Sequence, residues 1–590
     1  MHRDHAKSTL DEVRFPWYKG FNTTLTHGTL VLHVGKKVRA MYDTCMASGP
    51  IFGESVVELM DLLHHYGLRW PGPPESHETA LSVLIALDVD LQAAIWLVVR
   101  TRKLGWMRAV IISPSPFIMV FLKHHLSVMP SGKYRKYWRD FESAVLNTSG
   151  TPASDEDIAK AAAMEASILT WLANAYNTLS KSSAVFYFGQ IDLHTQPLSS
   201  EDWIKELNAK KELDSALTSS DKVITDDVRY LQAIGSIFAN YSNQDLLCHL
   251  AWHFIQQFAA VASYSLLHAR LGSGERFTFY RPAFCATNVE VSYKALVLAL
   301  YVVSRLQIDY VDSVNDAFDS LKETLFEKVN ASRWLDVGSK RMLGQKLSLL
   351  ANRSWPQPEF LRNNTLEAVY FGFPDNETSF GDYWIKSRLL LQKLNERVPG
   401  YEHVLELPGN NWPKYLLFSY MMGSVDVAIG APSRPLFYPQ GTRAMLYGGL
   451  GFSMALEMVK TMDSEGLKWH PSHGLAYSIN SRSTMSAYQA KDGCLKEHGF
   501  PSVFPEIPAM KITYAAYAKF SETNPPIDHA LPEDKVFFLT LCCMTCSQRG
   551  SRNPSSADCN KAVRGSPAFA EAFSCSKRSA MNPEKACSFF

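Results

Sequence analysis

Apolar residues recur at helical spacing through much of the first part of the chain. Between Asp155 and Ser180, and again between Leu231 and Leu271, they follow the three-to-four-residue period of amphipathic helices, and strand-type alternation is rare. Two longer apolar runs, residues 80–99 and 293–303, read as buried helices. Neither reads as a membrane span, because the first contains two aspartates and the second is too short. The pattern predicts a mainly α-helical structure for residues 1–400.

Proline and glycine interrupt this pattern in two places. The stretch "SWPQPEFLRNN" occupies residues 354–364, and "RVPGYEHVLELPGNNWP" occupies residues 397–413. A chain of 590 residues is too long for one ordinary core. We therefore expect two or more lobes, with a boundary in the second stretch.

Beyond this boundary, one stretch combines glycines with an apolar helical turn. It reads "YGGLGFSMALEMVKTMDSEG", from Tyr447 to Gly466, and its apolar turn is followed by Glu457 and Lys460. This pattern predicts an amphipathic helix with charged groups at its end.

The overall charge excludes some classes of partner. The net charge is +1 and 20% of the residues are charged, so the chain has no strong field for nucleic acid or an anionic membrane. A small molecule or a peptide is the better expectation for a ligand.

The N-terminus, "MHRDHAKSTLDEVRF", lacks the apolar core of a signal peptide. This leaves a cytosolic protein, export by another route, or an authentic N-terminus that lies further upstream. Six of the ten cysteines lie between Cys542 and Cys587, which is typical of disulfides. Acceptor motifs for N-glycosylation occur at Asn22, Asn147, Asn240, Asn330, Asn352, Asn363 and Asn376. These features favour an extracellular location, secreted or as the ectodomain of a membrane protein whose anchor is outside this sequence.

Several segments resemble one family. The C-terminal pieces "RPLFYPQGTRAMLYGGLGFSMALEMVKTMDSEG", "YAAYAKF", "FFLTLCCMTCSQRG" and "SPAFAEAFSCSKRSAMNPEKACSFF" resemble the catalytic lobe of the neprilysin and endothelin-converting-enzyme family of zinc metallopeptidases. Earlier pieces, among them "MYDTCMAS", "LRWPGPP", "DLLCHLAWHFI" and "SRWLDVGSKRMLGQKL", resemble family signposts in the expected order. The resemblance implies a mainly α fold with a smaller α+β part. A helical N-terminal lobe, residues 1–400, and a thermolysin-like C-terminal lobe, residues 401–590, would enclose a central cavity.

The resemblance also implies where a zinc site would lie. In the family a helix carries H-E-x-x-H, whose two imidazoles lie on one face and bind zinc while the glutamate activates a metal-bound water. The same frame holds Leu456, Glu457 and Lys460 here, so both ligands are replaced. The third ligand falls on Ser502, and Glu506 takes the place of an aspartate that orients a zinc-bound histidine. No metal cofactor is therefore expected, although zinc is the cofactor of the family.

The prolines and charges near these positions lead to two further expectations. Pro505 and Pro508 argue against an uninterrupted helix around Glu506. The ammonium of Lys460 is expected to pair with Glu457 at i,i+3 or with Glu506, while the alternative is a solvated lysine in an opened cleft.

The remaining family positions are also altered. A histidine and an arginine that serve the transition state fall on Arg552 and Asp558, and the substrate-gripping N-A-[FY] motif is replaced by residues 416–418, Leu-Leu-Phe. Only Glu457 keeps its identity. A general base of this kind needs a metal-bound water to deprotonate, so Glu457 alone is not expected to catalyse.

Other histidines and cysteines are not expected to replace the lost ligands. His470 and His473 read as a solvated loop pair, and the adjacent pairs at 64–65 and 124–125 read as surface or packing histidines. The CCxxC cluster at residues 542–546 has no second C-x-x-C nearby, so disulfides or buried thiols are the stronger expectation.

By resemblance, Cys45 pairs with Cys285 and Cys494 pairs with Cys587. Two further cysteines, at 546 and 575, match family cysteines whose partners lie in an N-terminal stretch absent from this sequence. They pair instead with one of the cysteines at 542, 543 and 559, or the authentic protein begins earlier. The pairing of these five residues and of Cys248 stays open.

Three functions follow from this comparison. The favoured one is a catalytically inactive, extracellular family member that binds or sequesters peptides, or binds a protein partner. The alternative is an active zinc metalloendopeptidase that cleaves small peptides. The third is a non-functional gene product.

Overall fold

The computed structural model describes residues 9–47, 49–74, 77–104, 107–129, 132–146, 152–177, 182–210, 215–306, 308–410, 415–470, 481–523, 531–545 and 558–590. Its contacts divide the chain into two compact units. Unit 1 comprises residues 1–24, 298–361 and 406–590, and unit 2 comprises residues 25–297 and 362–405. The last stretch of unit 1 begins close to the expected boundary near residue 400. The division into functional lobes at 1–400 and 401–590 stays a prediction.

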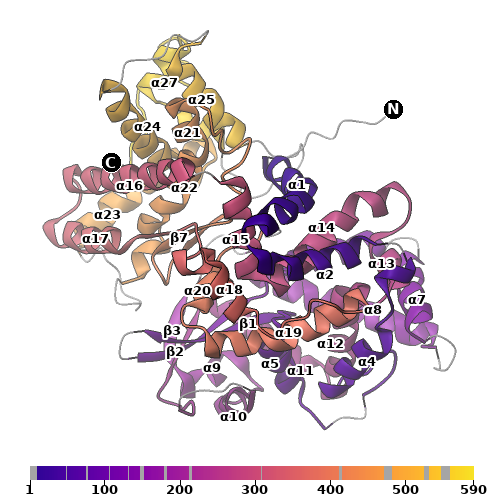
Figure 1. Ribbon diagram of the computed structural model, residues 1–590. Coiled ribbons are helices and arrows are strands. Elements are labelled where there is room, and N and C mark those ends of the chain that lie inside the picture. Colours follow the sequence, from indigo (N-terminus) through magenta and orange to yellow (C-terminus); the bar gives the residue numbers. More distant parts are fainter. Residues whose placement is uncertain are drawn as a thin grey trace. The chain divides into compact units, whose positions relative to one another are not determined.

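Helices dominate both units (Figure 1). Three of them, α1 (Thr9–Val31), α15 (Lys294–Arg305) and α20 (Tyr401–Glu406), run from one unit into the other. The other helices of unit 2 are α2 (Lys36–Met46), α3 (Gly49–Phe52), α4 (Val56–His65), α5 (Ala80–Leu91), α6 (Ile118–Val128), α7 (Lys133–Leu146), α8 (Asp155–Tyr176), α9 (Asp192–Thr195), α10 (Ser200–Lys210), α11 (Val228–Asn240), α12 (Asn243–Phe258), α13 (Tyr264–Leu271), α14 (Glu275–Ser292), α18 (Asn363–Val369) and α19 (Phe380–Arg397). Those of unit 1 are α16 (Ile308–Ala331), α17 (Val337–Leu349), α21 (Arg443–Leu446), α22 (Phe452–Met458), α23 (Arg482–Asp492), α24 (Glu506–Thr523), α25 (Glu533–Met544), α26 (Cys559–Val563) and α27 (Pro567–Ala572).

Each unit also contains a small sheet. In unit 2 the strand order is β1 (Leu97–Leu104), β2 (Met107–Pro114), β4 (Lys222–Thr225) and β3 (Ala184–Tyr187), and only the β2–β4 pair is parallel. In unit 1, β5 (Ala351–Arg353) runs parallel to β7 (Ser424–Val427), and β6 (Leu416–Ser419) is antiparallel to β7. β6 is therefore an edge strand of its sheet.

The helical prediction for residues 80–99 was wrong in its second half. Helix α5 ends at Leu91, because Gln92 adopts a left-handed conformation (φ 50°) that stops the helix. The following run, "IWLVVR", is rich in branched and aromatic residues and leads into strand β1. The other apolar run, at residues 293–303, is confirmed as a helix by α15.

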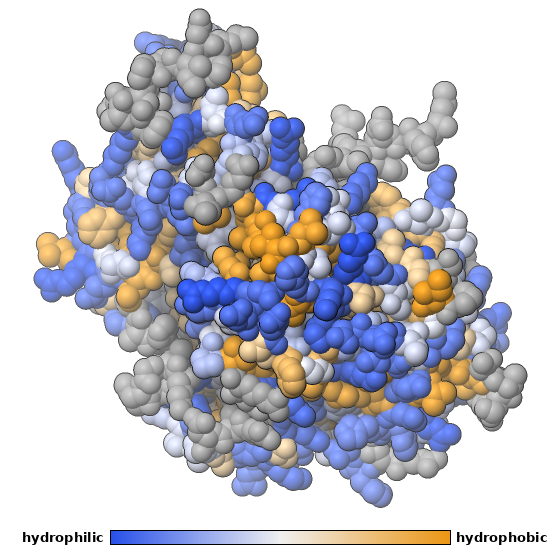
Figure 2. All heavy atoms as spheres, in the orientation of Figure 1, coloured by the Kyte–Doolittle hydropathy of each residue, from blue (hydrophilic) through white to orange (hydrophobic). Residues whose placement is uncertain are grey.

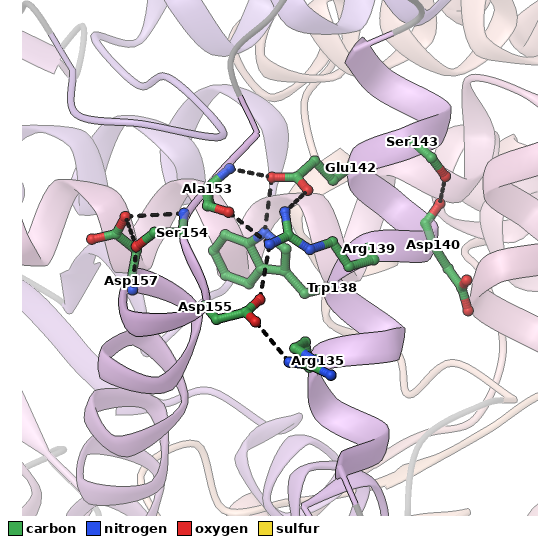
Figure 3. A network of polar contacts seen from close by, with 10 residues as sticks. All are labelled: Arg135, Trp138, Arg139, Asp140, Glu142, Ser143, Ala153, Ser154, Asp155 and Asp157. Carbon is green, nitrogen blue, oxygen red and sulfur yellow. Dashed lines mark hydrogen bonds and ion pairs between the residues drawn. The ribbon is translucent and has the colours of Figure 1, made fainter.

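The start of α8 shows how local sequence fixes a helix boundary in unit 2. Ser154 and Asp157 form a reciprocal capping box at its N-terminus. Figure 3 shows Arg139 of α7 reaching the carboxylates of Glu142 and Asp155 and the carbonyl of Ala153, so one guanidinium joins the end of α7 to the start of α8.

Both units bury apolar cores. Trp96, Trp203, Trp252 and Trp384 are almost wholly buried in unit 2, and the core of unit 1 is built from residues of α16, α22, α24 and α25. On the face drawn in Figure 2, hydrophilic side chains are interspersed with small apolar groups. Within the described residues, no single helix is long and apolar enough to cross a membrane. Helices α14 and α15 together have the length and apolar composition of a membrane span, but the pair is bent by 112°.

The disulfides confirm both pairings that the resemblance implied. Cys45 is bonded to Cys285 in unit 2, and Cys494 is bonded to Cys587 in unit 1. A third bond joins Cys542 of α25 to the first residue of α26, Cys559, which was one of the open possibilities. Position 546 lies outside the described residues, and position 575 is a thiol.

Candidate functional site

The helix that carries Glu457 changes its geometry along its length. Helix α21 continues through a π turn, η6 (Tyr447–Gly451), into α22, and the last turn, η7 (Val459–Met462), is a tighter 3₁₀ turn. Glu457 lies in the α-helical part, and Lys460 lies in the 3₁₀ turn.

The glycines of the π turn allow a close approach of neighbouring backbone. A Cβ atom on Gly448 would collide with the carbonyl oxygen of Phe537 in α25, and one on Gly449 would collide with the carbonyl oxygen of Leu436. Glycine is therefore required at both positions by packing.

The carboxylate of Glu457 is bound by two donors. Its Oε2 atom accepts a hydrogen bond from Lys460 Nζ at 2.5 Å and another from the backbone N–H of Phe418 at 2.8 Å. The side chain of Glu457 is 11% exposed and that of Lys460 is 20% exposed. Residues i and i+3 lie nearly above each other in a 3₁₀ turn, which favours this contact. The expected pairing of Lys460 with Glu457 is confirmed.

The backbone contact ties Glu457 to the edge strand β6. Strand residues alternate in the direction of their backbone groups, and Tyr415, just before β6, faces the β7 side because its carbonyl accepts the N–H of Ala428 at 2.8 Å. Phe418 consequently points its N–H away from β7, where Glu457 accepts it. Leu416, two residues earlier, points its backbone groups to the same edge of the sheet. The segment that replaces the N-A-[FY] motif is therefore a sheet edge.

The donor atoms around the predicted ligand positions do not fit a zinc site. Leu456 is half-buried against the core of unit 1 and offers no donor atom. Ser502 donates its hydroxyl hydrogen to the carboxylate of Asp492 and accepts the N–H of Phe504 at 3.0 Å. Zinc sites are built from imidazole, thiolate and carboxylate groups, and an ammonium such as that of Lys460 repels the ion.

Glu506 forms a second ion pair, with a lysine that sequence reasoning missed. Lys561 of α26 donates to Glu506 Oε2 at 2.6 Å and to the carbonyl of Phe504 at 2.7 Å, and both side chains are more than 90% buried. The backbone N–H of Asp558 donates to Glu506 Oε1 at 3.1 Å. No sequence signal marks Lys561, because it lies 55 residues from its partner.

The expectation that no uninterrupted helix runs through residues 502–506 is confirmed, because residues 502–505 lie outside the helix, but Pro508 does not interrupt the helix that follows. Helix α24 begins at Glu506 itself and runs without a break to Thr523. Pro505 precedes the helix, and Pro508 lies in the first turn, where its missing N–H has no helical acceptor to lose. Ser502 lies before the helix.

The two positions aligned with the transition-state groups are described only in part. Arg552 lies outside the described residues. Asp558 is the N-cap of α26, where its carboxylate accepts the backbone N–H of Lys561 at 3.2 Å. Its observed role is to begin a helix.

A cavity of about 190 Å³ lies in unit 1 beside the 3₁₀ end of this helix. Aromatic and methionine side chains form much of its wall. It is lined by Lys346, Leu349, Leu350, Phe418, Tyr420, Met421, Met422, Gly423, Thr461, Gly466, Trp469 and His470. The cavity is large enough to hold one aromatic ring.

A lysine that lines this cavity and an aspartate that is hydrogen-bonded to two lining residues have perturbed pKa values. Lys346 donates to the carbonyls of Thr461 and Gly466, and burial lowers its pKa to about 8. Burial raises the pKa of Asp463 to about 6, although Asp463 accepts hydrogen bonds from Tyr420 Oη at 2.7 Å and from the N–H of Gly466 at 2.7 Å. The sequence "DSEG" signals this turn, whereas nothing in the sequence around Lys346 sets it apart.

The other candidate ligands do not form a metal site. His473 lies outside the described residues, and the pair at 64–65 is exposed at the end of α4, as expected. Across the described ranges, no group of three or more histidine, cysteine, aspartate or glutamate side chains is arranged to hold a metal ion.

Helix α22 packs against α24, so the structure brings together the two segments on which a metallopeptidase of this kind would place its zinc ligands. The fold and this pairing define the class as metallopeptidase-like. Peptidase family M13 matches the chain over residues 6–353, which is more than half of its length. The chain belongs to peptidase family M13.

Relatives of known name support this assignment. Human neprilysin is 21% identical over 445 residues, an alignment that covers 67% of this chain and 58% of neprilysin. Human endothelin-converting enzyme 1 is 18% identical over 416 residues, covering 63% of this chain and 53% of that enzyme. The match thus spans less than two thirds of these relatives.

Solved structures show the same fold. The zinc metalloprotease Zmp1 of Mycobacterium tuberculosis, in complex with an inhibitor, has a TM-score of 0.68 at 15% identity, and the match covers 99% of this chain and 94% of Zmp1. PepO from Lactobacillus rhamnosis has a TM-score of 0.64 at 12% identity, covering 98% of this chain and 94% of PepO. These likenesses confirm the expected mainly α fold of the family.

Proposed function

We propose that this chain is a catalytically inactive member of family M13 that binds peptides without cleaving them. The single observation that carries the proposal is the state of Glu457. Its carboxylate is held by Lys460 and by the N–H of Phe418. A general base of this kind deprotonates a metal-bound water, whereas the Oε2 atom of Glu457 is occupied by a lysine ammonium and a backbone N–H.

The side chains at the predicted ligand positions support the same proposal. Leucine, lysine and serine stand at 456, 460 and 502. The loss of all three ligands leaves no first coordination sphere for zinc, so zinc affinity is expected to be negligible.

Two features of unit 1 support retained peptide binding. Strand β6 is an edge strand, and the backbone groups of Leu416 point away from β7, the direction from which an extended peptide adds to a sheet. Phe418, in the same strand, also lines the 190 Å³ cavity, whose aromatic and methionine wall suits one apolar side chain of such a peptide.

The decisive experiment measures zinc content and cleavage of quenched fluorescent peptides by the purified protein, with and without a chelator. The expected outcome is no zinc above background and no chelator-sensitive turnover. Chelator-sensitive cleavage would overturn the proposal in favour of the alternative, an active zinc metalloendopeptidase.

Peptide binding needs its own test, because an inert protein would also fail to cleave. Calorimetry with a library of apolar-rich peptides is expected to find binding to the wild type. Met422→Arg, which places a long side chain in the cavity, is expected to abolish this binding. Val337→Arg is the matched control, since Val337 is 74% exposed on α17 and does not line the cavity. Equal binding by both variants would contradict a role for the cavity.

We also propose an extracellular location. The Cys45–Cys285 and Cys494–Cys587 disulfides and the sequons support it. Mass spectrometry of the protein from its native source is expected to find glycans at the exposed Asn240 and Asn376. Unmodified asparagines throughout would count against this location.

A further inference from the structure

Four buried or half-buried histidines of unit 2 gather around one carboxylate. His249 and His253 lie one turn apart on α12, His124 and His125 lie on α6, and Glu165 lies on α8. The rings of His249 and His253 have their centroids 5.9 Å apart, and His125 Nδ1 lies 2.8 Å from Glu165 Oε1. The adjacent pair at 124–125 was expected to be surface or packing histidines, and His125 is in fact 1% exposed.

Glu165 is the centre of the hydrogen bonding. Its Oε1 atom accepts from His125, and its Oε2 atom accepts from Tyr134 Oη and from Gln256 Nε2, both at 2.9 Å. Trp252 Nε1 in turn donates to Tyr134 Oη at 2.8 Å. An ionised carboxylate can only accept hydrogen bonds, and each of the three groups that contact Glu165 can donate one. The charged form of Glu165 therefore has hydrogen-bond donors on both oxygens.

The two histidines of α12, unlike Glu165, have ring nitrogens without hydrogen-bond partners. Both ring nitrogens of His253, and Nε2 of His249, are buried without a hydrogen-bond partner in the described structure. Apolar rings cover them, because Phe121 lies 4.1 Å from His253 and Trp96 is stacked on His249 at 5.6 Å, both measured between ring centroids. A second proton on either imidazole would bring a buried charge without an acceptor.

The charged and titratable groups that face the cluster come from several helices. Besides Glu165 of α8, they are Tyr134 and Tyr137 of α7, Arg270 of α13 and Arg276 of α14. The two arginines disfavour further positive charge near His124 and His253, and Glu165 alone opposes them.

Burial lowers the pKa of His249 to about 4, that of His253 to about 3 and that of His124 to about 4. Burial alone would raise the pKa of Glu165, but the His125 hydrogen bond and the surrounding imidazoles lower it. An unfolded histidine has a pKa of about 6.5, so below this pH the unfolded chain binds protons that the folded chain excludes. The stability of the folded state is therefore full above about pH 6.5 and falls as the pH drops toward about 4.

We propose that this histidine cluster is an acid-sensitive device: in mildly acidic solution His249 and His253 can take up protons only when α12 separates from α6 and α8, so acid favours that separation and loosens the helical packing of unit 2, while unit 1 stays folded. The proposal is independent of peptide binding. It rests on the unpartnered, ring-covered imidazoles and on the positive groups that face them.

The test compares the full-length wild type with His249→Phe/His253→Phe, in which rings of similar size replace imidazoles that have unpartnered nitrogens. Melting temperatures are measured from about pH 8 to about pH 5. We expect the acid-induced fall in the wild type to exceed that of the double variant by about 5 °C or more. His64→Gln/His65→Gln, which alters two exposed histidines, is the control and should follow the wild type.

A second measurement does not depend on any variant. Hydrogen exchange of the wild type, corrected for the intrinsic effect of pH, is expected to show protection lost at about pH 5.5 in α6, α8 and α12 and kept in α16 and α24. A uniform loss over both units would overturn the proposal, as would equal pH dependence in the wild type and the double variant. Resonances of His249 and His253 that titrate near pH 6.5 in the folded chain would also overturn it.

Discussion

At the scale of single residues, Glu457 makes two structural contacts. Glu457 now connects the end of its own helix to the edge strand β6, through Lys460 on one side and the N–H of Phe418 on the other. Because the Glu457–Lys460 pair joins two elements of the fold, its contribution can be measured from the free energy of unfolding of variants.

Lys460→Met is expected to lower the free energy of unfolding by about 1–3 kcal/mol, because it leaves the mostly buried carboxylate of Glu457 with one neutral donor. Chemical denaturation measures this change. Lys136→Met is the matched control: Lys136 pairs with Asp140 at i,i+4, but its side chain is 75% exposed, and the expected change is within about 0.5 kcal/mol. An unchanged or raised stability of Lys460→Met would show that the pairing is not stabilising.

Asp463 gives a pH-dependent prediction at the same scale. Its pKa is raised to about 6 by burial, so the folded chain binds this proton more tightly than the unfolded chain. The wild type therefore gains stability from this group as the pH falls from above 6 toward 4, and it loses that gain at neutral pH.

Asp463→Asn mimics the neutral form and should remove this dependence. The stability of the variant relative to the wild type is expected to be higher at pH 8 than at pH 4 by about 2–3 kcal/mol. Denaturant melts at both pH values measure the difference, and Asp43→Asn, which changes an exposed carboxylate, serves as the control. A difference that does not vary with pH would contradict the raised pKa.

At the scale of elements, the helix from α21 to η7 is shaped by its glycines. Gly448→Ala is expected to destabilise the protein by more than about 2 kcal/mol, because the new methyl group meets the backbone of α25, which cannot move as a side chain can. Gly451→Ala, in the same π turn, meets its nearest atom at 3.1 Å and is expected to be much milder. Thermal melts distinguish the two, and equal effects would argue against backbone packing as the cause.

The elements also show how far sequence reasoning reaches. The helical period identified α8, α11 and α12, because amphipathic spacing is a local property, and the apolar run at residues 293–303 identified α15. Sequence reasoning failed between Leu91 and Leu97, where a left-handed residue ends a helix inside one apolar run. It also failed at Pro508, because a proline in a first helical turn looks like a helix breaker until the true start of the helix is known.

At the scale of the whole molecule, the disulfides hold distant stretches within each unit. The Cys494–Cys587 bond spans 93 residues, and the nearby Phe589 packs on Trp334, which also donates a hydrogen bond to its carbonyl. The C-terminus is thereby fixed to the core of unit 1.

Replacement of both cysteines by serine, Cys494→Ser/Cys587→Ser, is expected to cost about 4.6 kcal/mol in the chain-entropy description of a loop of this length. Removal of the Cys542–Cys559 bond, which spans 17 residues, should cost about 3 kcal/mol. Denaturant unfolding followed by far-ultraviolet circular dichroism measures both. Loss of the long bond without any change in stability would show that packing of the tail alone is sufficient.

Long-range partners are the part of the molecule that the sequence did not reveal. The pair of Glu457 with Lys460 was predictable, since three residues separate them. Lys561 with Glu506, and Glu165 with His125 and His253, come from helices separated along the chain, so only the fold brings them together. The cysteine pairs were predictable only through the resemblance to a family.

The 3₁₀ turn at the end of the Glu457 helix restricts how this protein could regain a metal. Side chains at i and i+4 are about 40° apart around an α-helix and about 120° apart around a 3₁₀-helix. Position 456 lies in the α-helical part and position 460 in the 3₁₀ turn, so histidines introduced at these positions would lie further apart around the axis than on a continuous α-helix. Leu456→His/Lys460→His/Ser502→Glu should therefore still bind no zinc in equilibrium dialysis. A zinc site of the H-E-x-x-H type at this place would require a change in the backbone geometry as well as three new side chains.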